Sequence, residues 1–88
     1  FNMFSGEEES VTLSCSNSIL DEIIEKFGDD VPIKTDGDSR FRIKANVEMS
    51  EGLVNWILQY GADIKVIIPK SLARAVKEKA QQILEIYE

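Results

Sequence analysis

The chain has 88 residues, of which 43% are hydrophobic and 30% charged, a globular composition that suits one compact domain. Its net charge of −6 argues against a generic binder of duplex DNA, because the protein as a whole repels the phosphate backbone. The sequence contains neither an apolar run of the roughly 20 residues that span a bilayer nor a signal-peptide pattern. Its single cysteine excludes an internal disulfide, and we expect a cytoplasmic protein without a membrane partner.

The first ten residues are predicted to be the remnant of an interdomain linker. Phe1, Met3 and Phe4 are apolar residues that precede an acidic stretch, as expected where a connection from another domain ends. Because the chain opens on phenylalanine instead of methionine, we expect a fragment of a longer protein, with the folded domain over residues 11–88. We predict that Phe1, Met3 and Phe4 contact another protomer or domain.

Strand and helix periodicities alternate along the first half of the chain. Apolar and polar residues alternate over residues 11–16, which predicts a strand in which Cys15 is a small buried hydrophobe. Asn17 or Ser18 is the expected N-cap of a helix that ends at Gly28. A second strand over residues 31–35 contains Pro32, which favours an edge position because proline cannot donate a ladder hydrogen bond.

The longest alternation, over residues 41–49, predicts a central strand that the turn at residues 36–38 joins to the second strand as a hairpin. Ser50 is the expected cap of a helix that Gly61 ends. A fourth strand over residues 63–68 is predicted to bury Ile64, Val66 and Ile68. A last helix begins near Ser71, with one apolar side made of Leu72, Val76, Ala80, Ile83 and Tyr87.

The predicted order is β-α-β-β-α-β followed by an extra helix. Two strand-helix-strand units joined by a hairpin are typical of an α+β, ferredoxin-like fold, here with an additional C-terminal helix. Right-handed crossovers would place the first and third strands at the centre of the sheet and the second and fourth at its edges.

The composition argues against catalysis and metal binding. The sequence has no histidine and one cysteine, so it lacks the commonest general base and the ligands of a structural zinc cluster. Neither GxGxxG nor a Walker motif occurs, and Asp36-Gly37-Asp38 is too short for an EF-hand loop. We therefore predict no catalytic residue, no metal site and no cofactor. Trp56 and Tyr60, at helical spacing, are interpreted as core packing.

The predicted open face of the sheet carries the candidate binding residues. If the apolar residues of each strand face the helices, the opposite face gathers Lys34, Arg42, Lys44 and Lys65. Such a concentration of positive charge on an acidic protein suits an anionic ligand, such as a nucleotide or single-stranded nucleic acid. The alternative is an ordinary solvated sheet face. The face lacks the stacking aromatics of RNA-binding domains.

Several segments resemble a known family, the C-terminal extension of WYL-domain transcriptional regulators. They are VTLSC (11–15), KFGDDV (26–31), NWILQYG (55–61) and VIIP (66–69), preceded by MFSGE (3–7).

The resemblance implies a bacterial regulator with an N-terminal helix-turn-helix that reads DNA, a central WYL domain and this module last. The expected function is regulation and oligomerisation, with the other domains of the regulator and a second protomer as partners. The alternative is an effector-sensing module that binds an anion on the open sheet face.

Overall fold

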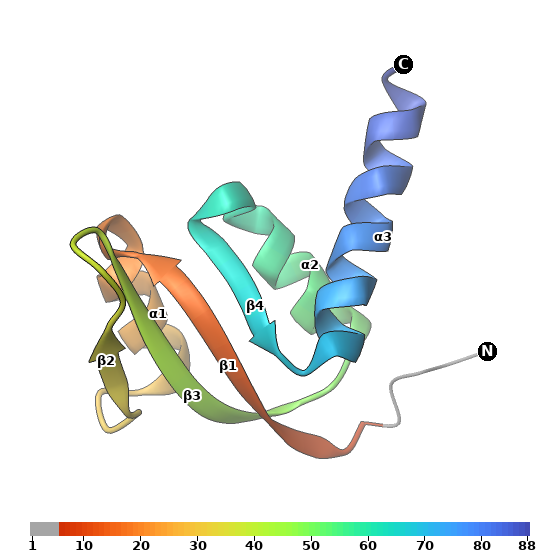
Figure 1. Cartoon of the computed structure of the whole chain (residues 1–88). Helices are drawn as coiled ribbons and strands as arrows, with labels where there is room; N and C mark the ends of the chain where they lie inside the picture. Colours follow the sequence, from red (N-terminus) through yellow and green to blue (C-terminus); the bar gives the residue numbers. More distant parts are fainter. Residues whose placement is uncertain (1–5) are drawn as a thin grey trace.

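Figure 1 shows a computed structural model of the chain, which describes residues 6–88. Within these residues the structure is α+β, with one four-stranded antiparallel sheet and three α-helices. The elements are β1 (Glu8–Ser16), α1 (Leu20–Phe27), β2 (Ile33–Thr35), β3 (Arg40–Glu48), α2 (Glu51–Gln59), β4 (Ile64–Ile68) and α3 (Lys70–Ile86). Short 3₁₀ turns at Asn17–Ile19 and Gly61–Asp63 precede α1 and β4. The residues 1–5 that contain Phe1, Met3 and Phe4 lie outside the described part.

The strands lie in the order β2-β3-β1-β4, and all neighbouring strands are antiparallel. The two nine-residue strands β1 and β3 pair along their whole length, from Glu8 opposite Glu48 to Ser16 opposite Arg40. The short β2, which follows Pro32, is an edge strand. Gly37, with φ of 80° in the turn after β2, supplies the left-handed backbone that side-chain-bearing residues avoid.

The core fills the space between one face of the sheet and the helices, of which α1 and α2 lie behind the sheet in Figure 1. Alternation places the apolar residues of β1 and β3 on this face, and each helix contributes its apolar side. The residues with the least exposure are Val11, Leu13, Cys15, Ile23, Ile43, Ile57 and Leu72. Burial raises the pKa of the Cys15 thiol to about 11, against a smaller opposing effect of the nearby Arg40 charge. The predicted role of Cys15 as a buried hydrophobe is confirmed.

β1 begins earlier than the apolar pattern indicates. Glu8, Glu9 and Ser10, which the sequence placed in the linker, form β-pairs with the last residues of β3. The backbone N–H of Met49 also donates to the carbonyl of Glu7 at 3.1 Å. Exposed strand residues carry no burial signal, so periodicity alone misses a strand extension that backbone pairing with β3 creates.

β4 contains an irregularity that moves one predicted core residue to the surface. Thr12 pairs with Ile68 and Leu13 with Val66, so the register shifts between these two β1 residues. A bulge adds one residue to a strand and reverses the facing of those that follow. Ile68 is consequently 54% exposed, and its predicted place beside Ile64 and Val66 in the core is wrong.

The N-cap predicted from the sequence is found at α2 but not at α1. At α2 the backbone N–H of Leu53 donates to Ser50 Oγ at 3.2 Å, so Ser50 is the N-cap as predicted. The predicted caps Asn17 and Ser18 instead lie in the 3₁₀ turn, and α1 begins after Ile19 without a side-chain cap.

α3 is only half embedded in the domain. Leu72 is fully buried, whereas every residue from Ala80 to Glu88 is exposed. Figure 1 shows the C-terminal half of α3 projecting away from the sheet and the other helices. No α-helix within residues 6–88 is long and apolar enough to cross a membrane.

Candidate functional site

The open face of the sheet brings the predicted basic residues onto one surface. Ser14 of β1 lies opposite Arg42 on β3 and Lys65 on β4, and Lys34 on β2 lies opposite Arg42. Lys44 lies one residue pair further along, opposite Thr12. Lys34, Arg42, Lys44 and Lys65 therefore share the face that points away from the core, as alternation predicts.

Arg40, which the sequence analysis missed, organises one end of this face. Its guanidinium donates to Ser14 Oγ and to the Ser14 carbonyl, both at 2.9 Å, and to Ser16 Oγ and the Asp63 carbonyl, both at 3.3 Å. These bonds join β3 to β1 and to the 3₁₀ turn before β4. Because its guanidinium makes four internal contacts, Arg40 is a structural residue and is not available to a ligand.

Arg42 is also engaged within the protein. Its Nε lies 3.2 Å from Asp36 Oδ2, which also accepts a hydrogen bond from Ser14 Oγ at 2.9 Å. The Ser14 hydroxyl and the Arg42 guanidinium together lower the pKa of the Asp36 carboxyl. The carboxylate therefore stays charged at neutral pH and offsets one positive charge of the face. An anionic ligand would compete with Asp36 for Arg42.

The three predicted lysines differ from Arg42 in this respect. Lys34, Lys44 and Lys65 are exposed, and within residues 6–88 the ammonium group of none of them lies in an ion pair or a hydrogen bond. Their ammonium groups are thus the positive charges that the face offers to solvent. Of the four predicted residues, the lysines fit a binding role better than Arg42.

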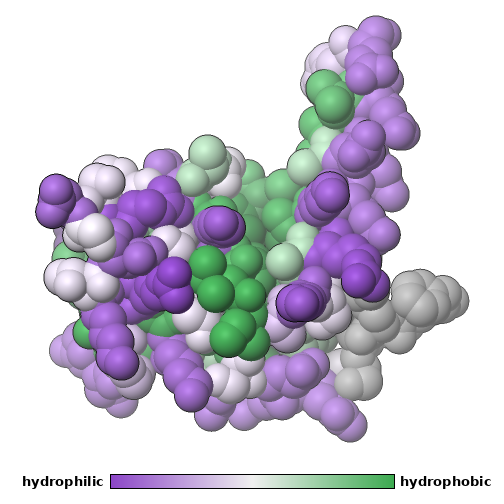
Figure 2. Space-filling model, in the orientation of Figure 1, coloured by the Kyte–Doolittle hydropathy of each residue, from purple (hydrophilic) through white to green (hydrophobic). Residues whose placement is uncertain are grey.

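A pocket of about 470 Å³ lies on the same face. Its lining combines basic and apolar groups: Thr12, Pro32, Lys34, Arg42, Ile43, Lys44, Ile67 and Ile68. Figure 2 shows the apolar part as a hydrophobic area over β4 with hydrophilic side chains around it. The irregularity in β4 creates this area, because it turns Ile68 out of the core next to Ile67. Lys65 does not line the pocket.

The chemistry of this pocket suits an anion that carries an apolar or planar portion. Lys34 and Lys44 provide positive charge that can bind a phosphate or carboxylate. Ile67 and Ile68 provide an apolar surface for the rest of the ligand. Ile68 lies opposite Thr12, which lies opposite Lys44, so the apolar and basic groups are direct neighbours across the sheet. The sequence predicted the charge of the face but not its apolar portion.

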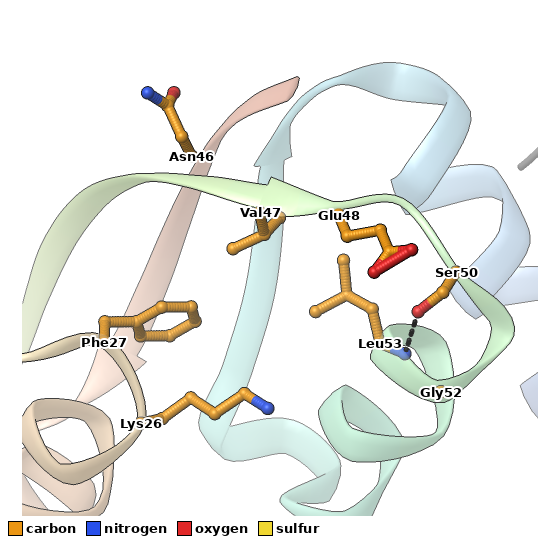
Figure 3. A pocket seen from close by; sticks show the side chains of 8 residues that line it. All are labelled: Lys26, Phe27, Asn46, Val47, Glu48, Ser50, Gly52 and Leu53. Atoms are coloured by element: carbon orange, nitrogen blue, oxygen red, sulfur yellow. Dashed lines mark hydrogen bonds between the residues drawn. The ribbon is translucent and has the colours of Figure 1, made fainter. Parts of the chain in front are cut away.

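A second pocket, of about 520 Å³, opens between the C-terminal end of α1 and the N-terminal end of α2. Figure 3 shows Phe27, Val47 and Leu53 lining its apolar side, and Lys26 at another side. Ser50 caps α2 there, so the Leu53 amide is already satisfied. The Lys26 ammonium lies 5.3 Å from the centre of the Trp56 ring, a cation–π distance. These groups are occupied within the protein, which makes this pocket the weaker candidate.

Trp56 and Tyr60 belong to an aromatic cluster that packs against the core. The Trp56 ring centroid lies 5.2 Å from that of Tyr60 and 5.5 Å from that of Phe27, both in edge-to-face geometry. All three residues are partly buried and contact the core residues. The interpretation of this pair as packing is confirmed.

Within residues 6–88 no three acidic or cysteine side chains come together in a way that would hold a metal ion. Asp36, from the acidic turn considered above, accepts from Ser14 and pairs with Arg42 instead.

The fold and this face define a small α+β domain with a mixed basic and apolar pocket on its sheet. The chain belongs to the WCX domain family, whose model matches residues 7–84. The match confirms the resemblance to the C-terminal extension of WYL-domain regulators, and it includes the strand residues that precede Val11. No curated protein and no solved structure matches the chain.

Proposed function

We propose that this chain is the regulatory and oligomerisation module of a bacterial WYL-type transcriptional regulator, in which a separate helix-turn-helix domain reads DNA. The observation that carries the proposal is the match to the WCX family over residues 7–84. A module of this kind acts by contacts with other domains or protomers and not by catalysis.

We also infer that the fold is ferredoxin-like, with α3 as the additional helix. Two observations support this inference. The chain order is strand-helix-strand, hairpin, strand-helix-strand, and β1 and β3 are the central strands. A solved structure of a WCX domain, superposed on this one strand by strand, is the direct test.

Self-association of the 88-residue chain tests the oligomerisation part of the proposal. We expect sedimentation equilibrium to show a concentration-dependent dimer, because α3 exposes large apolar residues that monomeric proteins usually cover. A chain that stays monomeric up to millimolar concentration contradicts this part of the proposal.

A second candidate function, the sensing of an anionic effector, is favoured by the pocket on the open face. Lys34 and Lys44 are unpaired there and lie beside the exposed Ile68. A ligand with a phosphate and a planar base, such as a nucleotide, would meet both the lysines and the isoleucines.

The variant Lys34→Glu with Lys44→Glu is expected to weaken nucleotide binding by at least about tenfold, because it replaces two attractive charges with repulsive ones. The measurement is an amide NMR titration of both proteins at low salt with mononucleotides and short single-stranded DNA. The matched control is Lys26→Glu with Arg74→Glu, which changes net charge equally on other elements. If both double variants bind equally, the open face is not the binding site.

A further inference from the structure

The C-terminal half of α3 has an apolar side without a partner in the domain. Val76 is partly buried against the core, but Ile83 is 44% and Tyr87 83% exposed. Leu84 and Ile86, which flank them, are 56% and 76% exposed. Figure 2 shows hydrophobic side chains along the projecting part of the helix.

This arrangement is unfavourable for an isolated chain in water. A helix gains most of its stability from packing its apolar side, and short segments without such packing are marginal. Four large apolar residues within two turns are more than scattered surface hydrophobes. The apolar side of the projecting half of α3 therefore requires a packing partner. α2 packs on the first half of α3 and does not bury these residues.

We propose that α3 of a second copy of this chain is the packing partner, and that the two helices pack antiparallel. The contact is made by Val76, Ala80, Ile83 and Tyr87, named here the α3 stripe. These residues follow one another at spacings of four, three and four, the pattern of a helix-pairing seam. The proposal rests on the proposed function and specifies the surface and the orientation by which the module oligomerises.

The sizes of the side chains in the α3 stripe favour the antiparallel orientation. With the two-fold axis beside the Gln81–Gln82 peptide bond, Tyr87 of one copy lies level with Val76 of the other. Ile83 likewise lies level with Ala80, so each larger side chain faces a smaller one. A parallel pair would place Tyr87 against Tyr87 and leave a gap between two alanines, which costs packing.

The charges beside the α3 stripe favour the same orientation. Lys77 lies within α3, and Glu88 directly follows Tyr87, the C-cap of the helix. Eleven residues, about three turns, separate the two, which places Glu88 at the end of the flank that carries Lys77. An antiparallel pair brings Lys77 of each copy toward Glu88 of the other, and two-fold symmetry makes this contact twice. A parallel pair would instead bring Lys77 toward Lys79 of the second copy, which already pairs with its own Glu51 at 3.5 Å.

In the antiparallel dimer the two folded bodies do not contact each other. Each sheet and its two covering helices lie at the N-terminal end of α3, so an antiparallel pair puts the two bodies at opposite ends. A single helix pair is a small interface, at the low end of the size range of specific contacts, below about 1,200 Å². We therefore expect a weak dimer of the isolated module, which the rest of a regulator would strengthen.

The variant Ile83→Lys tests whether the α3 stripe is the dimer interface. It places a charge in the centre of the α3 stripe and is expected to weaken dimerisation by at least about 30-fold in sedimentation equilibrium. Gln82→Lys is the matched control, because it adds the same charge to the neighbouring position outside the α3 stripe. Ile83 is partly exposed in the monomer, so both variants are expected to fold, which the amide NMR spectrum verifies.

The orientation has its own test. In a dimer mixed from isotope-labelled and unlabelled chains, filtered NOE spectra are expected to show contacts between the Tyr87 ring of one copy and the Val76 methyl groups of the other. Lys77→Glu and Glu88→Lys should each weaken the dimer by about three- to tenfold, and the double variant should restore it. In a parallel dimer the double variant would not restore association.

The outcomes separate this proposal from the proposed function. A wild-type dimer that Ile83→Lys leaves intact overturns the α3 interface while oligomerisation stands. A dimer sensitive to Ile83→Lys but without Tyr87–Val76 contacts overturns the antiparallel orientation. A wild-type chain that is monomeric at all concentrations overturns both.

Discussion

Replacement of Arg40 by methionine is expected to lower the free energy of unfolding by about 2–4 kcal/mol. The guanidinium holds the hydroxyl and carbonyl of Ser14, and Ser14 is only 3% exposed. Without Arg40 these buried polar groups lose a charged donor that methionine cannot replace. The bonds from Arg40 to Ser16 of β1 and to Asp63 in the 3₁₀ turn before β4 are lost at the same time.

Arg42→Met is the matched control for this prediction. Arg42 also lies on the open face, but its side chain is 47% exposed and its contact with Asp36 is a surface ion pair. Such pairs contribute about 0–1 kcal/mol, so the control should change stability little. Urea unfolding followed by the fluorescence of Trp56 measures both variants. Equal destabilisation by the two variants contradicts the structural role of Arg40.

Replacement of Leu13 by alanine is expected to cost about 2–5 kcal/mol of stability, from lost apolar burial and the cavity that remains. Leu13 is fully buried at the centre of β1, between β3 and β4. A domain of this size is stabilised by about 5–10 kcal/mol in total, so the variant would lose a large share of its stability.

The control for this change is Ile68→Ala, an aliphatic truncation on the same sheet. Ile68 is more than half exposed, and surface substitutions of this kind usually change stability by about 0.5 kcal/mol or less. Thermal unfolding monitored by circular dichroism compares the two. If Ile68→Ala destabilises as much as Leu13→Ala, Ile68 is buried in solution, for example by a bound partner or a second copy.

The sequence predicted the elements well where one face of an element is buried. The alternation in β1 and β3 and the helical spacing in α1 and α2 reflect burial against one core, and the structure has all four elements near the expected positions. The same alternation placed Lys34, Arg42, Lys44 and Lys65 on the open face, because side chains on a strand alternate with a fixed period.

The parts that the sequence missed depend on tertiary contacts that have no periodic signal. The outward turn of Ile68 follows from a change of register against β1, which the residues of β4 alone do not reveal. The pairing of Asp36 with Arg42 depends on the conformation of the turn after β2. This turn is closed by a hydrogen bond of 2.9 Å from the Asp36 N–H to the Arg40 carbonyl. Periodicity predicted the apolar side of α3 but not that the packing of this helix on the core ends before Ile83.

A dilution series of amide NMR spectra of the 88-residue chain tests whether this module assembles regulators through its projecting helix. We expect concentration-dependent shifts that cluster between Val76 and Tyr87, while the amides of β1 and β3 stay fixed. Spectra that do not change with concentration, or shifts confined to the sheet, would contradict it.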